Sequence, residues 1–129
     1  MRAGRSQGAM KVPRMDPTTK EFLEAILPDD STIVMRPMFG NESGFVNGHM
    51  FAGIFGTKIF IRLPDKDRNQ LLGEPGATIF EPMEGRPMTE YVALPDAWKR
   101  DPERARMWVR PSFRWVSTLP PKAKSKRKR

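Results

Sequence analysis

The chain has 129 residues, a formal net charge of +8 and no cysteine. A chain of this length buries one core of ordinary size, so the sequence predicts a single folded domain. The lack of cysteine excludes disulfides, thiolate metal ligands and cysteine nucleophiles, and it favours a reducing, cytoplasmic location. No run approaches the roughly 18 apolar residues of a membrane span, and the first residues lack the apolar core of a signal peptide.

The basic residues are concentrated at the two ends of the chain. Residues 1–14 hold four of the 23 basic groups and residues 122–129 hold six, with no acidic group in either segment. The 107 residues between them carry 13 basic and all 15 acidic groups, a balance of −2. We therefore predict a disordered segment at 1–15, a folded domain at 16–121 and a basic tail at 122–129.

Three helices are predicted from capping signals and apolar spacing. Asp16 followed by Pro17 is typical of a helix start, and Pro28 ends that first helix. Its inward face is formed by Phe22, Leu23, Ile26 and Leu27. A short second helix starts at 64–65 and ends at Gly73, and the third runs from Asp101 to about 119. Pro111 costs this last helix about 3 kcal/mol of propensity and should bend it.

Between the helices the sequence predicts strands. The dipeptide Asn47-Gly48 favours a type I′ hairpin turn, because both residues must adopt positive φ. The predicted strands are Thr32–Met38, Phe45–Val46, His49–Phe55, Lys58–Leu63, Ala77–Glu81 and Glu90–Leu94, with a turn-rich loop at 82–87. The order is helix, three or four strands, helix, two strands, helix. This order predicts an α+β two-layer domain in which all helices cover one face of an antiparallel sheet.

Strict alternation along the strands predicts which residues face away from the helices. Ile59, Ile61 and Leu63 point one way, and Met50, Ala52 and Ile54 share a face in the preceding strand. The residues left for the other face are Phe51, Phe55 and Phe60. An uncovered aromatic face is a candidate interface.

Several separated motifs occur in the order seen in one known family. They are Arg36-Pro-Met-Phe-Gly40, Phe45-Val-Asn-Gly-His-Met-Phe-Ala52, Phe80-Glu-Pro-Met-Glu-Gly-Arg-Pro-Met88, Glu90-Tyr91, Leu94-Pro95, Trp108, Ser112 and Leu119-Pro-Pro-Lys122. On these residues, from about 22 to 122, the chain resembles the TfoX (Sxy) N-terminal domain family. The resemblance implies an α+β domain similar to secretion-chaperone-like folds. It also implies a link to regulation of natural DNA uptake, in which better-known members act as coactivators beside the cyclic-AMP receptor protein.

The chain differs from those better-known members in two respects. They carry a second, helical C-terminal domain, whereas only a short basic tail follows Lys122 here, so the resemblance is to a single-domain member. The loop after Phe39 reads Gly-Asn-Glu-Ser-Gly where two-domain members commonly have Gly-Gly-Tyr-Gly. The resemblance implies no catalytic residues.

Candidate interaction residues lie on the predicted strands and on one loop. They are Phe51, Phe55, Phe60, Lys58, Arg62 and Arg86. Lys58, Phe60 and Arg62 on one strand face are similar to single-stranded nucleic-acid platforms, although a protein or self-association surface is the favoured interpretation. The Arg86 guanidinium could grip a carboxylate or phosphate, and the simpler alternative is an ion pair with Glu81, Glu84 or Glu90.

The basic tail is a candidate for loose, nonspecific nucleic-acid contact, and ordinary counter-ion binding is the alternative. Its cations are Lys122, Lys124, Lys126, Arg127, Lys128 and Arg129. His49 is the only histidine and lacks partners at metal-ligand or catalytic spacing, so we interpret it as a polar strand residue. The glycines at 40–56 match no phosphate-binding motif.

These observations predict a non-enzymatic regulatory or interaction module without metal or cofactor, acting through protein contacts or self-association. The first alternative is a nucleic-acid-binding protein that uses the tail and the Phe60 face. The second is a small enzyme, for which Glu90, Tyr91 and Arg86 are the only candidate group.

Overall fold

The computed structural model describes residues 14–38 and 40–122. Its elements are α1 (Pro17–Ile26), β1 (Val34–Met38), β2 (Asn41–Val46), β3 (His49–Phe55), β4 (Lys58–Arg62), α2 (Asp65–Leu72), β5 (Thr78–Met83), β6 (Arg86–Ala93), the 3₁₀ helix η1 (Asp96–Arg100) and α3 (Pro102–Ser117). The six strands form one antiparallel sheet in the order β1-β2-β3-β4-β6-β5. The predicted α+β class and element order are confirmed.

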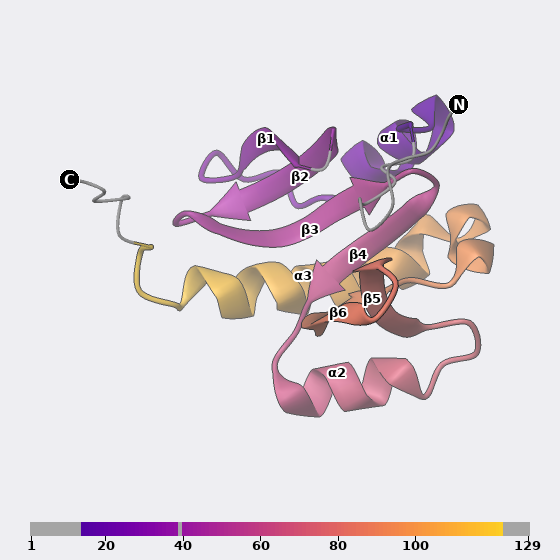
Figure 1. Cartoon of the computed structure of the whole chain (residues 1–129). Coiled ribbons are helices and arrows are strands. Elements are labelled where there is room, and N and C mark those ends of the chain that lie inside the picture. The colour runs from indigo at the N-terminus through magenta and orange to yellow at the C-terminus, as the bar shows by residue number, and fades with distance from the viewer. Residues whose placement is uncertain (1–13, 39, 123–129) are drawn as a thin grey trace, which may run out of the picture.

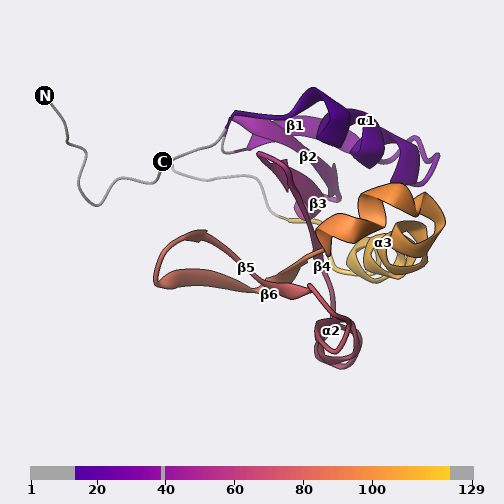
Figure 2. The same cartoon turned by 90° about the vertical axis from the view of Figure 1, so that its right-hand side faces the viewer.

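The sheet is strongly curved, and the helices lie on its outer side (Figures 1 and 2). In Figure 2, α1 and α3 lie against β2 to β4, α2 lies beside β6 at the lower end, and the β5–β6 hairpin projects away from the helical layer. The central strands β3 and β4 therefore pack between the helices on one side and the curled ends of the sheet on the other.

The helix boundaries follow the predicted caps. The Asp16 carboxylate accepts hydrogen bonds from the backbone N–H of Thr19 at 2.9 Å and from its hydroxyl at 3.0 Å. Asp101 caps α3 in the same way, through the N–H of Arg104 at 3.3 Å. Pro111 lies inside α3, and the helix continues past it as predicted but ends at Ser117, just short of the predicted end at about 119. Met15 packs against the main core, whereas residues 1–13 of the expected disordered segment lie outside the described residues.

The β2–β3 turn has the predicted geometry and also anchors the end of the chain. Asn47 and Gly48 have φ of +54° and +82°. The Asn47 carbonyl accepts from the Lys122 N–H at 2.8 Å, and its side-chain amide donates to the Ser117 carbonyl at 3.1 Å. His49 Nε2 lies 2.8 Å from the Pro120 carbonyl oxygen. Of the predicted tail, only Lys122 is described, and residues 123–129 lie outside the described part of the chain.

Two strands extend further than the sequence indicated. The turn-rich segment 82–87 was expected to be a loop, but most of it belongs to β5 and β6. The two strands form a hairpin in which Met83 pairs with Arg86, and Gly85 in the turn has φ of +80°. Two prolines fit this hairpin because β5 is an edge strand and the register of the pair is irregular there.

A β-bulge in β3 overturns the predicted facing of Phe51. Gly44 pairs with Ala52 but Phe45 pairs with Met50, so Phe51 is the extra residue. Phe51 and Ala52 both enter the core beneath the helices, and Met50 joins the opposite face. The carbonyl of the bulged Phe51 accepts a hydrogen bond from the buried Ser112 hydroxyl at 3.1 Å.

The face that was predicted to be uncovered contains a second hydrophobic cluster. Its buried members are Phe45, Met50, Phe60 and Phe80, with Met38, Phe55, Met88 and Tyr91 packed around them. The rings of Phe60 and Phe80 stack at 4.2 Å with an interplanar angle of 10°. A Cβ on Gly53 would come within 2.5 Å of the Phe60 ring, so this glycine gives the ring its space. Sheet curvature thus covers the aromatic side chains that alternation left exposed.

Candidate functional site

The predicted aromatic interaction residues are mostly inaccessible. Phe51 and Phe60 are fully buried, and Phe55 is half-buried with its ring 5.5 Å from that of Phe80. A nucleic-acid base or a partner side chain stacks only on an exposed ring face. Phe60 therefore offers no stacking platform in this fold.

The cations beside Phe60 are engaged in ion pairs. Lys58 Nζ lies 3.1 Å from the Asp96 carboxylate. Arg62 lies 2.7 Å from the Glu90 carboxylate, and its guanidinium also sits over the Trp115 ring at 5.4 Å. The partner carboxylates come from other elements, Asp96 from η1 and Glu90 from β6. They account for both charges without an external anion.

Arg86 does not make the ion pair considered for it. It lies exposed at the start of β6 and has no ion pair within residues 14–38 and 40–122. Of its expected partners, Glu90 pairs with Arg62, and Glu81 accepts from the Gly85 N–H at 2.6 Å.

The candidate enzyme group is not assembled around a reactive centre. The Tyr91 hydroxyl donates to the Met50 carbonyl at 2.9 Å, a bond between β6 and β3 that crosses the intervening strand. Burial raises the pKa of Tyr91, while smaller effects of Arg62 and Glu90 oppose each other. The phenol is therefore a neutral donor that ties the sheet together. Within the described residues, no hydrogen bond or ion pair joins Arg86 to Glu90 or Tyr91.

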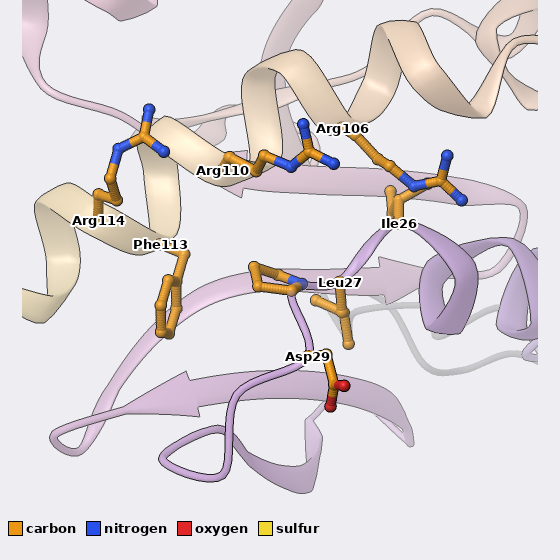
Figure 3. Close-up of a pocket in the computed structure, with 8 residues that line it drawn as sticks. Ile26, Leu27, Asp29, Arg106, Arg110, Phe113 and Arg114 are labelled. Carbon is orange, nitrogen blue, oxygen red and sulfur yellow. The ribbon is translucent and has the colours of Figure 1, made fainter.

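A different set of cations lines a cleft between the end of α1 and α3 (Figure 3). Arg106, Arg110 and Arg114 are spaced by four residues, which puts them along one face of α3. The cleft has a volume of about 380 Å³, and its other walls are Ile26, Leu27, Pro28, Asp29 and Phe113. In Figure 3 the three guanidinium groups lie on the α3 side, and the Asp29 carboxylate points away from them. We call this the basic cleft.

The three arginines differ in how many hydrogen bonds and ion pairs they make within the protein. Arg106 donates two hydrogen bonds to the Ala25 carbonyl, at 3.1 and 2.9 Å, and pairs with Glu103 at 3.0 Å. Arg110 is half exposed and is 3.7 Å from the same Glu103 carboxylate. Arg114 is exposed and has no ion pair within the described ranges. Arg106 therefore joins α3 to α1, while Arg110 and Arg114 remain able to bind an anion.

A second cleft of opposite charge adjoins the first. It has a volume of about 430 Å³ and is lined by Glu24, Leu27, Pro28, Asp29, Asp30, Ile33, Met35 and Glu42. Hydrogen bonds from the hydroxyl and N–H of Thr32 lower the pKa of Asp30 and keep it ionised. We call this the acidic cleft. It shares Leu27, Pro28 and Asp29 with the basic cleft.

Comparison with protein families gives one match, to the model described as TfoX N-terminal domain, over residues 25–115. This range is well over half of the chain. The chain belongs to the TfoX N-terminal domain family. Comparison with curated proteins and with solved structures gave no match.

Most of the two-cleft surface of this TfoX N-terminal domain falls inside the family match, since only Glu24 precedes residue 25. Within the part of the chain that the structure describes, no group of three or more His, Cys, Asp or Glu side chains could hold a metal ion. None of its described helices has the length and apolar character needed to cross a membrane.

Reasoning from the sequence did not find the basic cleft. The spacing of Arg106, Arg110 and Arg114 was visible and indicated one charged helix face. The other wall, Leu27 to Asp29, is some 80 positions earlier in the chain, as the Arg106 bonds to Ala25 show. Only the packing of α1 against α3 joins the two walls.

Proposed function

We propose that this TfoX N-terminal domain is a non-enzymatic interaction module with a regulatory role, and that it acts through protein contacts at the basic cleft. The observation that supports this most directly is the combination of two available guanidinium groups with an apolar floor. Arg110 and Arg114 stand beside Leu27, Pro28 and Phe113. Arginine together with half-buried apolar side chains is typical of protein interfaces.

The charge of the site favours an acidic protein segment as the partner. Arginine binds carboxylates with two parallel hydrogen bonds, and these bonds strengthen when a partner excludes water. The apolar floor would pack against the partner's aliphatic side chains. A nucleic-acid backbone would use the guanidinium groups but would leave that floor without a matching surface.

The resemblance to TfoX family members supports regulation linked to DNA uptake or transcription as the process served. The absence of cysteine supports a cytoplasmic site of action. In this proposal the domain contributes contacts with other proteins, and any affinity of the basic ends for nucleic acid is secondary.

Photo-crosslinking in living cells tests the proposed function. A photoreactive amino acid at Asp29, an exposed position lining the cleft, should give a protein adduct. The matched control is Met107, which is 63% exposed on α3 but lies outside the basic cleft. R110E/R114E should remove the adduct from position 29 and should change the transcripts that deletion of the whole gene changes.

Two results would contradict the proposal. One is equal crosslinking from positions 29 and 107, which would show that the cleft has no preferred partner. The other is an adduct at position 29 that nucleases remove, since that would identify nucleic acid as the occupant.

A further inference from the structure

We propose that the partner at the basic cleft is a second copy of this chain, docked so that the basic cleft of each copy meets the acidic cleft of the other. The inference rests on the proposed function, because it names the occupant of the same surface. It makes the protein a two-fold symmetric dimer whose axis passes near Leu27 and Pro28, the apolar residues common to both clefts.

The two clefts carry complementary charges. The acidic cleft is lined by four carboxylates and by no cation. The basic cleft is lined by three arginines, with the carboxylate of Asp29 at the boundary. Glu24, Asp29 and Glu42 make no ion pair within residues 14–38 and 40–122, and neither does Arg114. One surface of the domain thus presents unsatisfied charges of both signs.

The two clefts lie side by side, as a two-fold symmetric interface requires. In a two-fold interface, residue i of one copy contacts residue j of the other, and j contacts i. A self-complementary surface therefore needs its positive and negative halves side by side, with residues compatible with themselves at the centre. Leu27 and Pro28 are apolar and half-buried, and they lie, with the exposed Asp29 beside them, where the two halves meet. They would pack against their own copies.

Apolar side chains extend this surface on the acidic side. Met35 lines the acidic cleft and is 37% exposed, and its neighbour Val34 is 48% exposed. These are two of the three large hydrophobic residues exposed in the described structure. A second copy would remove them from water, which adds a hydrophobic contribution to the ionic one.

Two other occupants fit less well. The basic ends of the chain could enter the acidic cleft, but they would be repelled by Arg110 and Arg114 and would leave the basic cleft empty. Strand addition at β1 is weakened by Pro37, because this exposed edge strand lacks one N–H donor. Docking through side chains of the two clefts satisfies both charges with one partner.

Sedimentation equilibrium with two charge-reversed variants tests the dimer. The 129-residue chain should dimerise reversibly, with a dissociation constant that rises when the salt concentration is raised. R110E/R114E and E24K/E42K should each be monomeric, because symmetry counts every reversed charge twice. We expect each to raise the dissociation constant at least about a hundredfold. An equimolar mixture of the two variants should form a heterodimer. In it, R110E/R114E presents negative charge at both clefts and E24K/E42K presents positive charge at both, so each of the two contacts joins opposite charges.

The control is K66E/R100E, which reverses two exposed cations outside both clefts and makes the same change in net charge as R110E/R114E. It should dimerise like the parent chain. Circular dichroism checks that every variant is folded, and R110A/R114A and E24A/E42A replace any reversal variant that is not. A monomeric parent chain, or a mixture that stays monomeric, overturns the dimer.

A variant of the chain with serine at the basic positions 124 and 126–129 tests whether the tail, rather than the basic cleft of a second copy, occupies the acidic cleft. Dimerisation of this variant supports docking between the clefts, and its loss assigns the acidic cleft to the tail and overturns the proposal. The proposed function fails independently: a monomeric protein that still forms cleft-specific adducts with another protein retains it. Only the identity of the partner would then be wrong.

Discussion

Replacing Phe60 by alanine should damage the stability of the protein rather than a binding surface. Phe60 is fully buried, stacks on Phe80 at 4.2 Å and meets the edge of Tyr91 at 5.6 Å. Truncation of a buried phenylalanine costs about 3–5 kcal/mol, because the transfer free energy is lost and a cavity remains. A domain of this size has roughly 5–15 kcal/mol in total, so F60A should lose a large part of it.

Urea unfolding followed by tryptophan fluorescence measures this loss. The three tryptophans, all in or beside the helical layer, report global unfolding. F55A is the matched control from the same cluster, and its half-buried ring should cost clearly less. A loss below about 1 kcal/mol for F60A would refute the reasoning, because it would mean that the ring is not enclosed. The aromatic face would then again be a candidate interface.

Three further predictions follow from single contacts. G53A should destabilise the fold by about 1–3 kcal/mol in the same urea assay, because its methyl would lie 2.5 Å from the Phe60 ring; unchanged stability would contradict that packing. S112A should lower the free energy of unfolding by about 1–3 kcal/mol, because the buried Phe51 carbonyl loses the hydroxyl that donates to it. S112T keeps the hydroxyl, so an equal loss in S112T would show that the size of the side chain, and not the hydrogen bond, is responsible. Hydrogen bonds at the α1 cap lower the pKa of Asp16 below its ordinary 3.8, so their stabilisation is complete above that pH and disappears as the pH falls through the lower folded-state pKa. The melting temperature of D16N should therefore fall less steeply than that of the parent chain as the pH is lowered, and an unchanged pH dependence would contradict this assignment.

The bulge at Phe51 shows where reasoning from the sequence failed. Alternation assigns faces correctly only while each residue opposes one partner. The shift between Gly44 and Phe45 adds one residue to β3 and reverses the facing of Phe51 relative to Phe55. The partner of the bulged carbonyl, Ser112, is 61 residues away and could not indicate the bulge from local sequence.

The second error concerned exposure rather than direction. Phe60 was correctly assigned to the face opposite the helices, yet it is buried because Phe80 reaches over it from the β5–β6 hairpin. The curvature of the sheet decided this result. Phe80 lay inside a predicted strand, but its local sequence did not indicate that the curved sheet would bring its ring onto Phe60.

Local chemistry was sufficient for several features that depend on neighbours in the chain. The sequence by itself determined the cap at Asp16, the turn at Asn47-Gly48, the end of α2 at Gly73 and the element order, because capping, positive φ and periodicity act within a few residues. The tertiary structure alone decided which aromatic rings are enclosed and which charges meet. Both clefts join the Leu27–Asp29 segment to distant residues, and that proximity is created only when the helices pack on a curved sheet.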